Sequence, residues 1–412
     1  MSTLATLPAG APGAARRPCA QRWPLALAVL ALFGWLLWSV SARQALLLLV
    51  GVGLGWALAA ARFGFTTGWR HLVEHRDPSG VYGQIILLAA LSLLSMPLLA
   101  HFPETQAALG PPSVSLLIGA FVFGLAMQIS DGCGSGTLYK AGAGSPLSFV
   151  VLPTFAFGSF LGASHQPAGI EFGGLPAVDL RAFGWPTALA ITVAACGLVA
   201  WLAGRAARSA QEGVGPGNKA PASPQAVAQQ LVRAGTASFV ASAAPRRAAR
   251  FARRWWLGAL LLAVLYLLHL IVAGQPWGIV YGMGVWGAKA VAALGWDLSA
   301  DAFWGVAPHA QRLVDPILAD VTSVTNIGLI YGAIAASRWS GPADFSLPSG
   351  KRLIAAAIAG LVMGYSARMA FGCNVGAYLG GIASASVHGW VWFALAFAGS
   401  IVGVRIRRRV GA

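Results

Sequence analysis

Long apolar runs alternate with short polar or glycine-rich segments along the whole chain. The runs are about 17–25 residues long, which is the length that a helix needs to cross about 30 Å of hydrocarbon. Ten such runs are present, and an even number of spans places both ends of the chain on one side of a membrane. The pattern predicts ten transmembrane helices, at 23–41, 45–62, 80–100, 113–131, 147–165, 186–204, 255–274, 321–338, 352–371 and 388–404.

Four further segments are rich in glycine, moderately polar and mostly too short to cross. Irregular backbone at membrane depth is tolerated only where protein buries it or water reaches it. We therefore expect re-entrant half-helices, although two of the segments could be ordinary surface loops. The four segments are 62–77, 132–146, 277–296 and 372–386.

The composition supports a membrane protein. Hydrophobic residues make up 57% of the chain and charged residues only 10%, whereas a soluble domain has about 25% charged residues. A single aqueous core cannot bury this much apolar surface. We therefore predict an all-α polytopic membrane protein with about ten transmembrane helices plus short re-entrant helices.

The net charge of +16 arises from 28 Lys and Arg against 12 Asp and Glu, and its distribution argues against nucleic-acid binding. Nine basic residues fall within 205–254, where Glu212 is the one acid, and the chain closes on RIRRR. Such clusters beside spans mark cytoplasmic loops, although a site for anionic lipid or a partner is the alternative. The location expected is therefore a bacterial inner membrane with both termini cytoplasmic.

The same features divide the chain into five parts. The apolar run after Arg22 is longer than the core of a signal peptide, so we expect a retained first span. The predicted parts are a cytoplasmic tail (1–22), a first transmembrane half (23–204), a basic cytoplasmic linker (205–254), a second transmembrane half (255–404) and a basic C-terminal tail (405–412).

Four cysteines are present, and they are too few and too scattered for a disulfide framework. No CxxC or Cys/His spacing typical of zinc occurs, so neither a metal nor another cofactor is expected. The four are Cys19, Cys133, Cys196 and Cys373.

An internal repeat relates the two halves. Aligning Cys133 with Cys373 gives an offset of 240 residues, and FGSFLG (157–162) then matches AGSIVG (398–403) with one residue inserted. With ten spans, the two cysteine motifs follow spans that run in opposite directions. This predicts a pseudo-symmetric inverted repeat, which places a substrate site near the midplane. Three glycine pairs share the offset: Gly124 with Gly364, Gly132 with Gly372, and Gly136 with Gly376.

The repeated GC-x-x-G motif predicts a binding site for a small anion. Glycine permits a sharp bend and close approach of a ligand, and a helix that starts there points unpaired N–H groups at it. A neutral thiol is a weak donor and a soft surface, which suits terminal sulfur better than sulfate oxygens. Close helix packing with small buried cysteines is the alternative. The residues predicted along the path are Gly132, Cys133, Gly134, Ser135, Gly136, Gly372, Cys373, Asn374 and Gly376.

Other polar residues inside the apolar runs are candidates for anion or gating contacts. Arg368 and Lys289 are cations at membrane depth, where a charge is costly, although pairing with Asp131 or with a carbonyl is an equal alternative. Thr325 and Asn326 could donate to oxygens or simply join helices. Cys196 stands alone in an apolar run and is interpreted as packing.

Several motifs together resemble the YeeE/YedE sulfur-transport family of bacterial inner-membrane proteins, whose characterised members take up thiosulfate. They are GCGSGTLY, WGAK, DVTSVTNIG, MGYSARMAFGCNVGA and GIASASVHGWVWF. The resemblance implies a compact bundle in which Cys133 and Cys373 touch the sulfur of the passing ion. Family members often carry another cysteine in the first re-entrant segment, where this chain has Thr66 and Thr67. This departure leaves a related sulfur or selenium species open.

Three function classes follow. The first is a transporter or channel, without enzymatic activity, for a small sulfur-containing anion such as thiosulfate; no GxxxxGK[ST] motif for ATP is present, so a gradient or consumption of the substrate must drive it. A cytoplasmic sulfur-carrier or sulfurtransferase protein would be a suitable partner. The second is a membrane thiol enzyme handling sulfane sulfur, which would need a base, and His388 is the nearest histidine in sequence. The third is a structural subunit.

Overall fold

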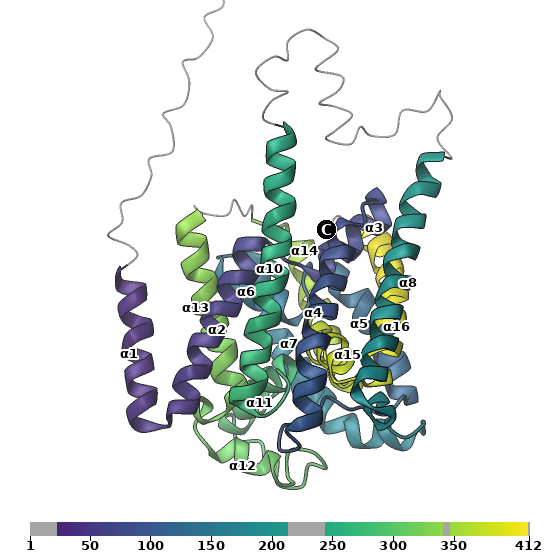
Figure 1. Ribbon diagram of the computed structural model, residues 1–412. Helices are drawn as coiled ribbons and strands as arrows, with labels where there is room; N and C mark the ends of the chain where they lie inside the picture. The colour runs from purple at the N-terminus through teal and green to yellow at the C-terminus, as the bar shows by residue number, and fades with distance from the viewer. Residues whose placement is uncertain (1–22, 213–243, 341–346, 411–412) are drawn as a thin grey trace, which may run out of the picture.

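The computed structural model describes residues 23–212, 244–340 and 347–410, and the described chain is helical without a named β-strand. Every predicted span coincides with a long helix (Figure 1). The long helices are α1 (Trp23–Ser39), α2 (Ala42–Ala61), α4 (Ser79–His101), α5 (Val114–Ile129), α7 (Pro146–Glu171), α8 (Trp185–Glu212), α10 (Ala244–Ala273), α13 (Val321–Ser340), α14 (Gly350–Met369) and α16 (Val387–Val410).

Eight segments in the described part are long and apolar enough to cross a membrane. The two predicted spans outside this set are α1, which has only 17 residues, and α13, whose 20 residues include a run of threonine, serine and asparagine. The prediction of an all-α polytopic membrane protein is confirmed, and the number of ten spans stays a prediction.

Short helices occupy all four segments that were expected to hold half-helices. They are α3 (Phe65–His75), α6 (Gly134–Gly142), α11 (Ile279–Ala293), and η4 (Asn374–Gly380) continued by α15 (Gly381–Ala383). The stretch η4 is a π-helix, a rare geometry that is frequent at functional sites. Three shorter elements lie in the connections: η2 (Leu180–Phe183), α12 (His309–Val314) and η3 (Ile317–Ala319).

Both ends of the predicted linker are helical, because α8 continues to Glu212 and α10 already begins at Ala244. The rest of that linker, at 213–243, lies outside the described residues, as do the N-terminal tail and Cys19. In Figure 1 the end of α8, the start of α10 and the end of α16 lie at the same, upper end of the bundle.

Serine residues begin three of the long helices. The hydroxyl oxygens of Ser41, Ser113 and Ser349 accept hydrogen bonds from the backbone N–H groups of the residue three positions ahead. A capping serine satisfies an N–H group that has no partner within the helix and typically stabilises it by about 1 kcal/mol. These caps fix where α2, α5 and α14 start.

Small residues let the long helices touch backbone to backbone. On α2, a Cβ at Gly51 or Gly55 would overlap the carbonyl oxygens of α13, and on α13 a Cβ at Gly328 or Gly332 would overlap those of α2. Both helices therefore carry glycines four residues apart at their contact, which is the small-xxx-small arrangement of membrane helix pairs. Glycines also allow this close approach where α7 meets α14, with two on each helix, and where α5 meets α16, with one on α5 and two on α16. The glycines there are Gly158, Gly162, Gly360 and Gly364 for the first pair, and Gly124, Gly399 and Gly403 for the second.

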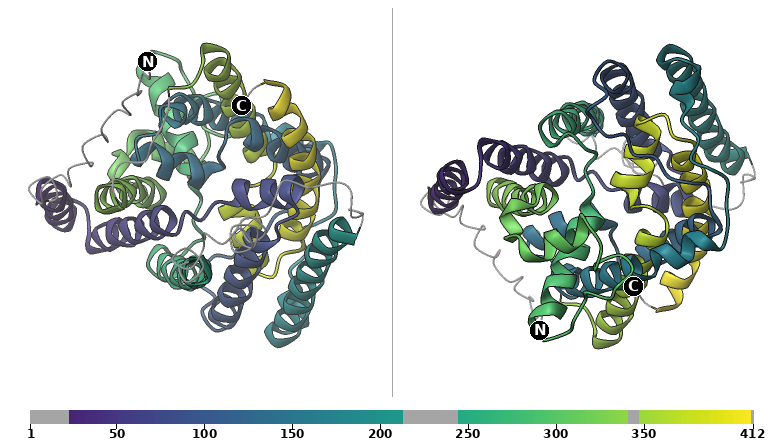
Figure 2. Two further views of the ribbon diagram at one scale, coloured as in Figure 1. Left: turned by 90° about the horizontal axis from the view of Figure 1, so that it is seen from above. Right: turned by 90° about the horizontal axis from the view of Figure 1, so that it is seen from below.

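Each of these three pairs joins a helix before residue 213 to one after residue 320, so the two halves interlock. Seen along the bundle axis, α1 and α8 lie at the periphery (Figure 2). The short helices fill the interior between the pairs, where α6 contacts α13 and α7, and η4 contacts α16. The packing thus brings the two cysteine motifs to the centre.

Candidate functional site

The two cysteine motifs begin with the same backbone turn. Asp131 and Phe371 each have a φ of 59°, the left-handed conformation that ends a helix. One residue later, Gly132 donates to the Met127 carbonyl at 3.2 Å and Gly372 donates to the Ala367 carbonyl at 2.8 Å. All these positions are separated by the offset of 240 residues found in the sequence, which supports the prediction of a repeat.

Cys133 and Cys373 each stand immediately before a short helix. Both have extended backbones, with φ and ψ of −89° and −173° for Cys133 and −98° and −166° for Cys373. The Cys133 carbonyl accepts from the N–H of Thr137 at 2.8 Å, and the Cys373 carbonyl accepts from that of Ala377 at 2.9 Å. No side chain caps the start of either helix. Backbone N–H groups at both starts are therefore free of a capping side chain, as a ligand site requires.

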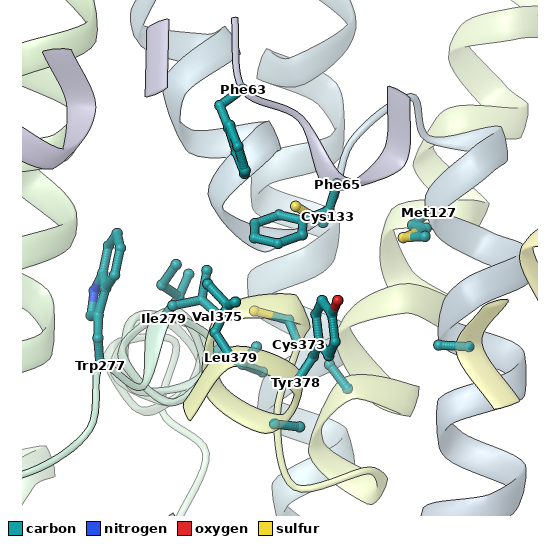
Figure 3. Packing of buried hydrophobic residues seen from close by; sticks show 14 of the residues in the cluster. Phe63, Phe65, Met127, Cys133, Trp277, Ile279, Cys373, Val375, Tyr378 and Leu379 are labelled. Carbon is teal, nitrogen blue, oxygen red and sulfur yellow. The ribbon is translucent and has the colours of Figure 1, made fainter. Parts of the chain in front are cut away.

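Both thiols lie in the buried interior of the molecule, and Figure 3 shows the Cys133 sulfur above the Cys373 sulfur. The Sγ of Cys373 lies 3.1 Å from the place that a Cβ on Gly134 would take, directly beside Cys133. The Cys133 Sγ lies 3.4 Å from the Ser135 hydroxyl and 3.4 Å from a Cβ built on Gly136. Glycines at these positions therefore leave room along the sulfur atoms.

Apolar side chains close this centre to solvent. The exposed fractions are 1% for Cys133 and 0% for Cys373. A small cavity with about 20 Å³ of room is lined by Phe65, Trp277 and Val375, among others, and Val375 is two residues after Cys373. This is enough for roughly one water molecule, so the centre is closed to a small anion in this conformation.

Aromatic rings hold η4 in place. The Tyr378 ring stacks on Phe393 and Trp392 of α16, at centroid distances of 5.1 and 6.1 Å, and meets Trp69 of α3 edge to face at 6.1 Å. Trp392 also donates to the Gly372 carbonyl at 3.2 Å. Gly372 itself has a φ of 146°, and a Cβ there would lie 2.7 Å from the Ala377 nitrogen, so only glycine fits this turn.

Several buried polar groups around the thiols lack a hydrogen-bond partner. Both amide atoms of Asn374, which is 0% exposed, are unpaired, and so are the hydroxyls of Thr66, Thr137 and Tyr266. An unpaired buried polar group costs about 1–3 kcal/mol. Thr137 and Tyr266 are candidates that the sequence did not single out, because a hydroxyl on an apolar helix gives no signal of its own. Thr67, the neighbour of Thr66, is only partly buried and packs beside Gly64.

Three other candidates are engaged in structural hydrogen bonds. Asn326 accepts from the Trp277 indole at 3.1 Å and donates to the Ile279 carbonyl at 3.2 Å, which fixes the start of α11. Thr325 donates to the Val321 carbonyl at 2.8 Å, within its own helix. The Lys289 ammonium donates to the carbonyls of Leu313 and Asp315 at 2.6 and 2.5 Å. Lys289 therefore pairs with carbonyl oxygens, which is one of the two alternatives to an anion contact given above.

Arg368 is a cation without a carboxylate partner in the described part of the chain. It donates to the Gln166 side chain at 2.8 Å, and its guanidinium lies 4.9 Å from the Phe303 ring and 5.7 Å from the Tyr281 ring. Its buried Nε has no acceptor. The alternative that Arg368 pairs with Asp131 is wrong, because Arg70, Lys140 and Arg407 hold that carboxylate.

The remaining cysteine of the described chain lies elsewhere. Cys196 is on α8, is 3% exposed and belongs to the hydrophobic core. Cys133, Cys196 and Cys373 are all free thiols. Among the described residues, no group of three or more His, Cys, Asp or Glu side chains is placed to hold a metal ion.

Comparisons with known proteins find relatives that are named as transporters. The chain is 29% identical over 136 residues to "Probable transporter YedE" of Escherichia coli (strain K12), covering 32% of this chain and 33% of that protein. It is 28% identical over 124 residues to "Thiosulfate transporter TsuA" of the same organism, covering 30% and 35%. These matches span only about a third of each relative.

A longer match links the chain to "Thiosulfate transporter TsuA" of Spirochaeta thermophila, at 23% identity over 376 residues, covering 84% of this chain and 93% of that protein. A family model described as sulphur transport matches residues 60–402. This confirms the resemblance carried by the glycine-cysteine motifs. The chain therefore belongs to the sulphur-transport family.

Proposed function

We propose that this protein carries a small sulfur-containing anion, thiosulfate in the first place, across the bacterial inner membrane. The observation that carries the proposal is the presence of two buried free thiols at the starts of two short helices, with the Cys373 Sγ lying against Gly134, the residue after Cys133. Two relatives are named as thiosulfate transporters, which supports the choice of substrate.

The two thiols suit the sulfur end of the anion. A neutral S–H group is a weak donor and a polarisable surface, so it contacts terminal sulfur with little penalty. Sulfate has the same charge but presents only oxygen. Two thiols in succession therefore favour thiosulfate over sulfate.

Unpaired buried donors suit the oxygen end. The Asn374 amide stands next to Cys373, and the Thr137 hydroxyl lies near Gly132, 3.1 Å from a Cβ built there. Thr66 of α3 is a third such group and lies in the segment where the family resemblance implies a further cysteine. Oxygen atoms of a bound anion would satisfy these donors, which are otherwise costly to bury.

Arg368 would attract the anion before it reaches the thiols. Its helix, α14, leads directly into the Cys373 turn, and within the described residues its guanidinium contacts Gln166 and the rings of Tyr281 and Phe303 without a carboxylate. A charge in such a place is expected to serve a ligand or an ion pathway. We assign Arg368 to capture, and we assign Lys289, Thr325 and Asn326 to supporting the fold.

Movement is part of the proposed mechanism, because the thiols are 1% and 0% exposed and the small cavity lined by Val375 holds about one water. The interlocked halves would open one end of the path at a time, as inverted repeats do. In this proposal the basic 205–254 region and both termini lie on the cytoplasmic side. A cytoplasmic sulfur-carrier or sulfurtransferase protein would then consume the anion and keep uptake moving inward.

Uptake of labelled thiosulfate into proteoliposomes that contain only this protein tests the proposal. Transport predicts that intact thiosulfate accumulates inside and that excess unlabelled thiosulfate competes better than sulfate. A thiol enzyme would instead break the S–S bond, keep one sulfur atom as a persulfide on the protein and release sulfite. Sulfite release without internal label would overturn the transport proposal in favour of that enzyme.

A further inference from the structure

One carboxylate at the upper end of the bundle binds three cations. Asp131 accepts hydrogen bonds from the Arg70 guanidinium at 2.7 Å and the Lys140 ammonium at 2.9 Å, and it forms an ion pair with the Arg407 guanidinium at 3.0 Å. All four side chains are largely buried, with exposed fractions of 24% for Asp131 and 15%, 19% and 13% for the three cations in the same order. The cations come from α3, α6 and α16, so the carboxylate ties three elements together.

The charges of this cluster do not balance. Three positive charges against one negative charge leave an excess of two. Within the described residues, no second carboxylate lies within ion-pair distance of these cations, and nearby Glu74 is paired with Arg408 at 3.0 Å. The Arg407 guanidinium also donates to the Gln128 carbonyl at 2.9 Å, and the Lys140 ammonium donates to the Asp131 carbonyl, but neither acceptor carries a charge. An excess of positive charge that is partly removed from water is costly, and a divalent anion would neutralise it.

The cluster adjoins the proposed path. Asp131 begins the turn that leads to Cys133, and Lys140 lies on the helix that Cys133 starts. Arg70 lies on α3, which also carries Phe65, one of the residues that close the central cavity. Holding Arg70 and Lys140 on one carboxylate therefore keeps the two short helices together.

We propose that this cluster is a second anion site, which binds a small divalent oxyanion and in which the Asp131 carboxylate is the built-in competitor. That the transported anion is the one arriving here rests on the proposed function. When the anion takes the cations, the Asp131 carboxylate is displaced and the turn that it begins is no longer tied to α3 and α16, while the anion itself links the three cations. When the anion leaves, the carboxylate returns to the cations. Anion binding and movement of this turn are then coupled, because the anion binds only the state in which Asp131 has left the cations.

The binding of labelled sulfate to the purified protein in detergent, at constant ionic strength set with chloride, tests this site without relying on transport. Asp131→Asn removes the competitor and keeps the shape of the side chain. Because the carboxylate reduces the fraction of protein ready to bind, we expect sulfate affinity to rise about tenfold or more in Asp131→Asn. Affinity that is unchanged or lower would mean that Asp131 only staples the helices, and would overturn the proposal.

Two further variants complete the test. Asp179→Asn is the matched control, since it removes a carboxylate from an arginine pair, that with Arg181 at 2.7 Å, and leaves the cluster intact. It should bind sulfate as the unchanged protein does. Arg407→Gln removes a cation and should lower sulfate affinity by roughly tenfold, the opposite direction, which keeps the test decisive even if Asp131→Asn does not fold.

The two proposals fail separately. If Asp131→Asn binds sulfate more tightly but the unchanged protein does not take up thiosulfate, the anion site stands and the transport function falls. If thiosulfate uptake is normal and neither substitution in the cluster alters sulfate binding, the transport function stands and the second site is excluded.

Discussion

The Sγ of Cys373 and the α-carbon of Gly134 are in such close contact that a Cβ on Gly134 would lie 3.1 Å from the sulfur. The same Cβ would lie 3.4 Å from the Ile279 side chain. Gly134 is the first residue of α6 and follows Cys133. The absence of a side chain at this one position is therefore what allows the second thiol to face the first motif.

Gly134→Ala should slow thiosulfate uptake strongly while the protein remains folded. The added methyl group would crowd the Cys373 sulfur, whereas alanine in a helix is favoured over glycine by up to about 1 kcal/mol. Uptake per correctly inserted protein measures the effect. Gly197→Ala on α8 is the matched control, because nothing lies within 4 Å of its Cβ. Equal uptake by both variants would show that the contact between Gly134 and Cys373 is not on the path.

Cys133→Ser and Cys373→Ser should each abolish most uptake, because a hydroxyl keeps the size of the thiol but replaces a soft atom by a hard one. Cys196→Ser should be nearly silent, since this thiol lies in the packing of α8. If the two central cysteines only fill space, serine costs about 1–3 kcal/mol of stability and leaves the uptake per folded molecule unchanged. Full activity in both central variants would defeat the mechanism.

Asn374→Leu should make the protein more stable and less active. Both amide atoms of Asn374 are buried without partners, so an apolar side chain of similar size should stabilise the fold by about 1–3 kcal/mol. The loss of donors to the anion should raise the KM for thiosulfate. Asn326→Leu is the contrasting control: it breaks two hydrogen bonds, with Trp277 and Ile279, and should destabilise the fold. Thermal unfolding and uptake are measured on the same preparations, and an unchanged KM in Asn374→Leu would remove this residue from the site.

Arg368→Gln should raise the KM for thiosulfate about tenfold or more, with a smaller effect on the maximal rate, because the lost charge acts on capture and not on passage between the thiols. Lys289→Met removes another cation of the same region whose partners are two carbonyl oxygens, and its KM should stay unchanged. Uptake measured over a range of thiosulfate concentrations separates the two variants. A change in KM of the same size in both would indicate a general effect of charge.

The positions of the helices could be predicted from the sequence, because the length of an apolar run and its glycine-rich end are local properties. All ten predicted spans are helices, and the segments around Cys133 and Cys373 hold short helices that begin where the glycines suggested. The central place of both thiols followed from the repeat. The number of spans was harder to predict. The helix α13 packs against α2, but it is not among the segments that are apolar enough to count as spans.

The partners of the charged and polar residues could not be predicted, because they come from distant parts of the chain. Asp131 meets Arg70 and Arg407, which are 61 and 276 residues away. The two carbonyl oxygens that accept from Lys289 belong to Leu313 and Asp315, in the connection between α11 and α13. The partners of Asn326 are Trp277, which precedes α11, and Ile279, which begins it. Only the folded arrangement distinguishes these bonded groups from Asn374, which has the same chemistry and no partner.

The equivalent turns at Asp131 and Phe371 give the two ends of the molecule different sensitivities to dissolved salt. At one end the turn offers a carboxylate to three cations, and such attractions weaken as the screening length falls from about 10 Å at 0.1 M to about 3 Å at 1 M salt. At the other end Phe371 packs on Gly110 and His388, and apolar contacts of this kind tighten in strongly hydrated salts. A rise in ionic strength around the Asp131 turn would thus loosen that end of this protein without any change in its substrate, and the Phe371 turn, which among the described residues holds no ion pair of this kind, would stay in place.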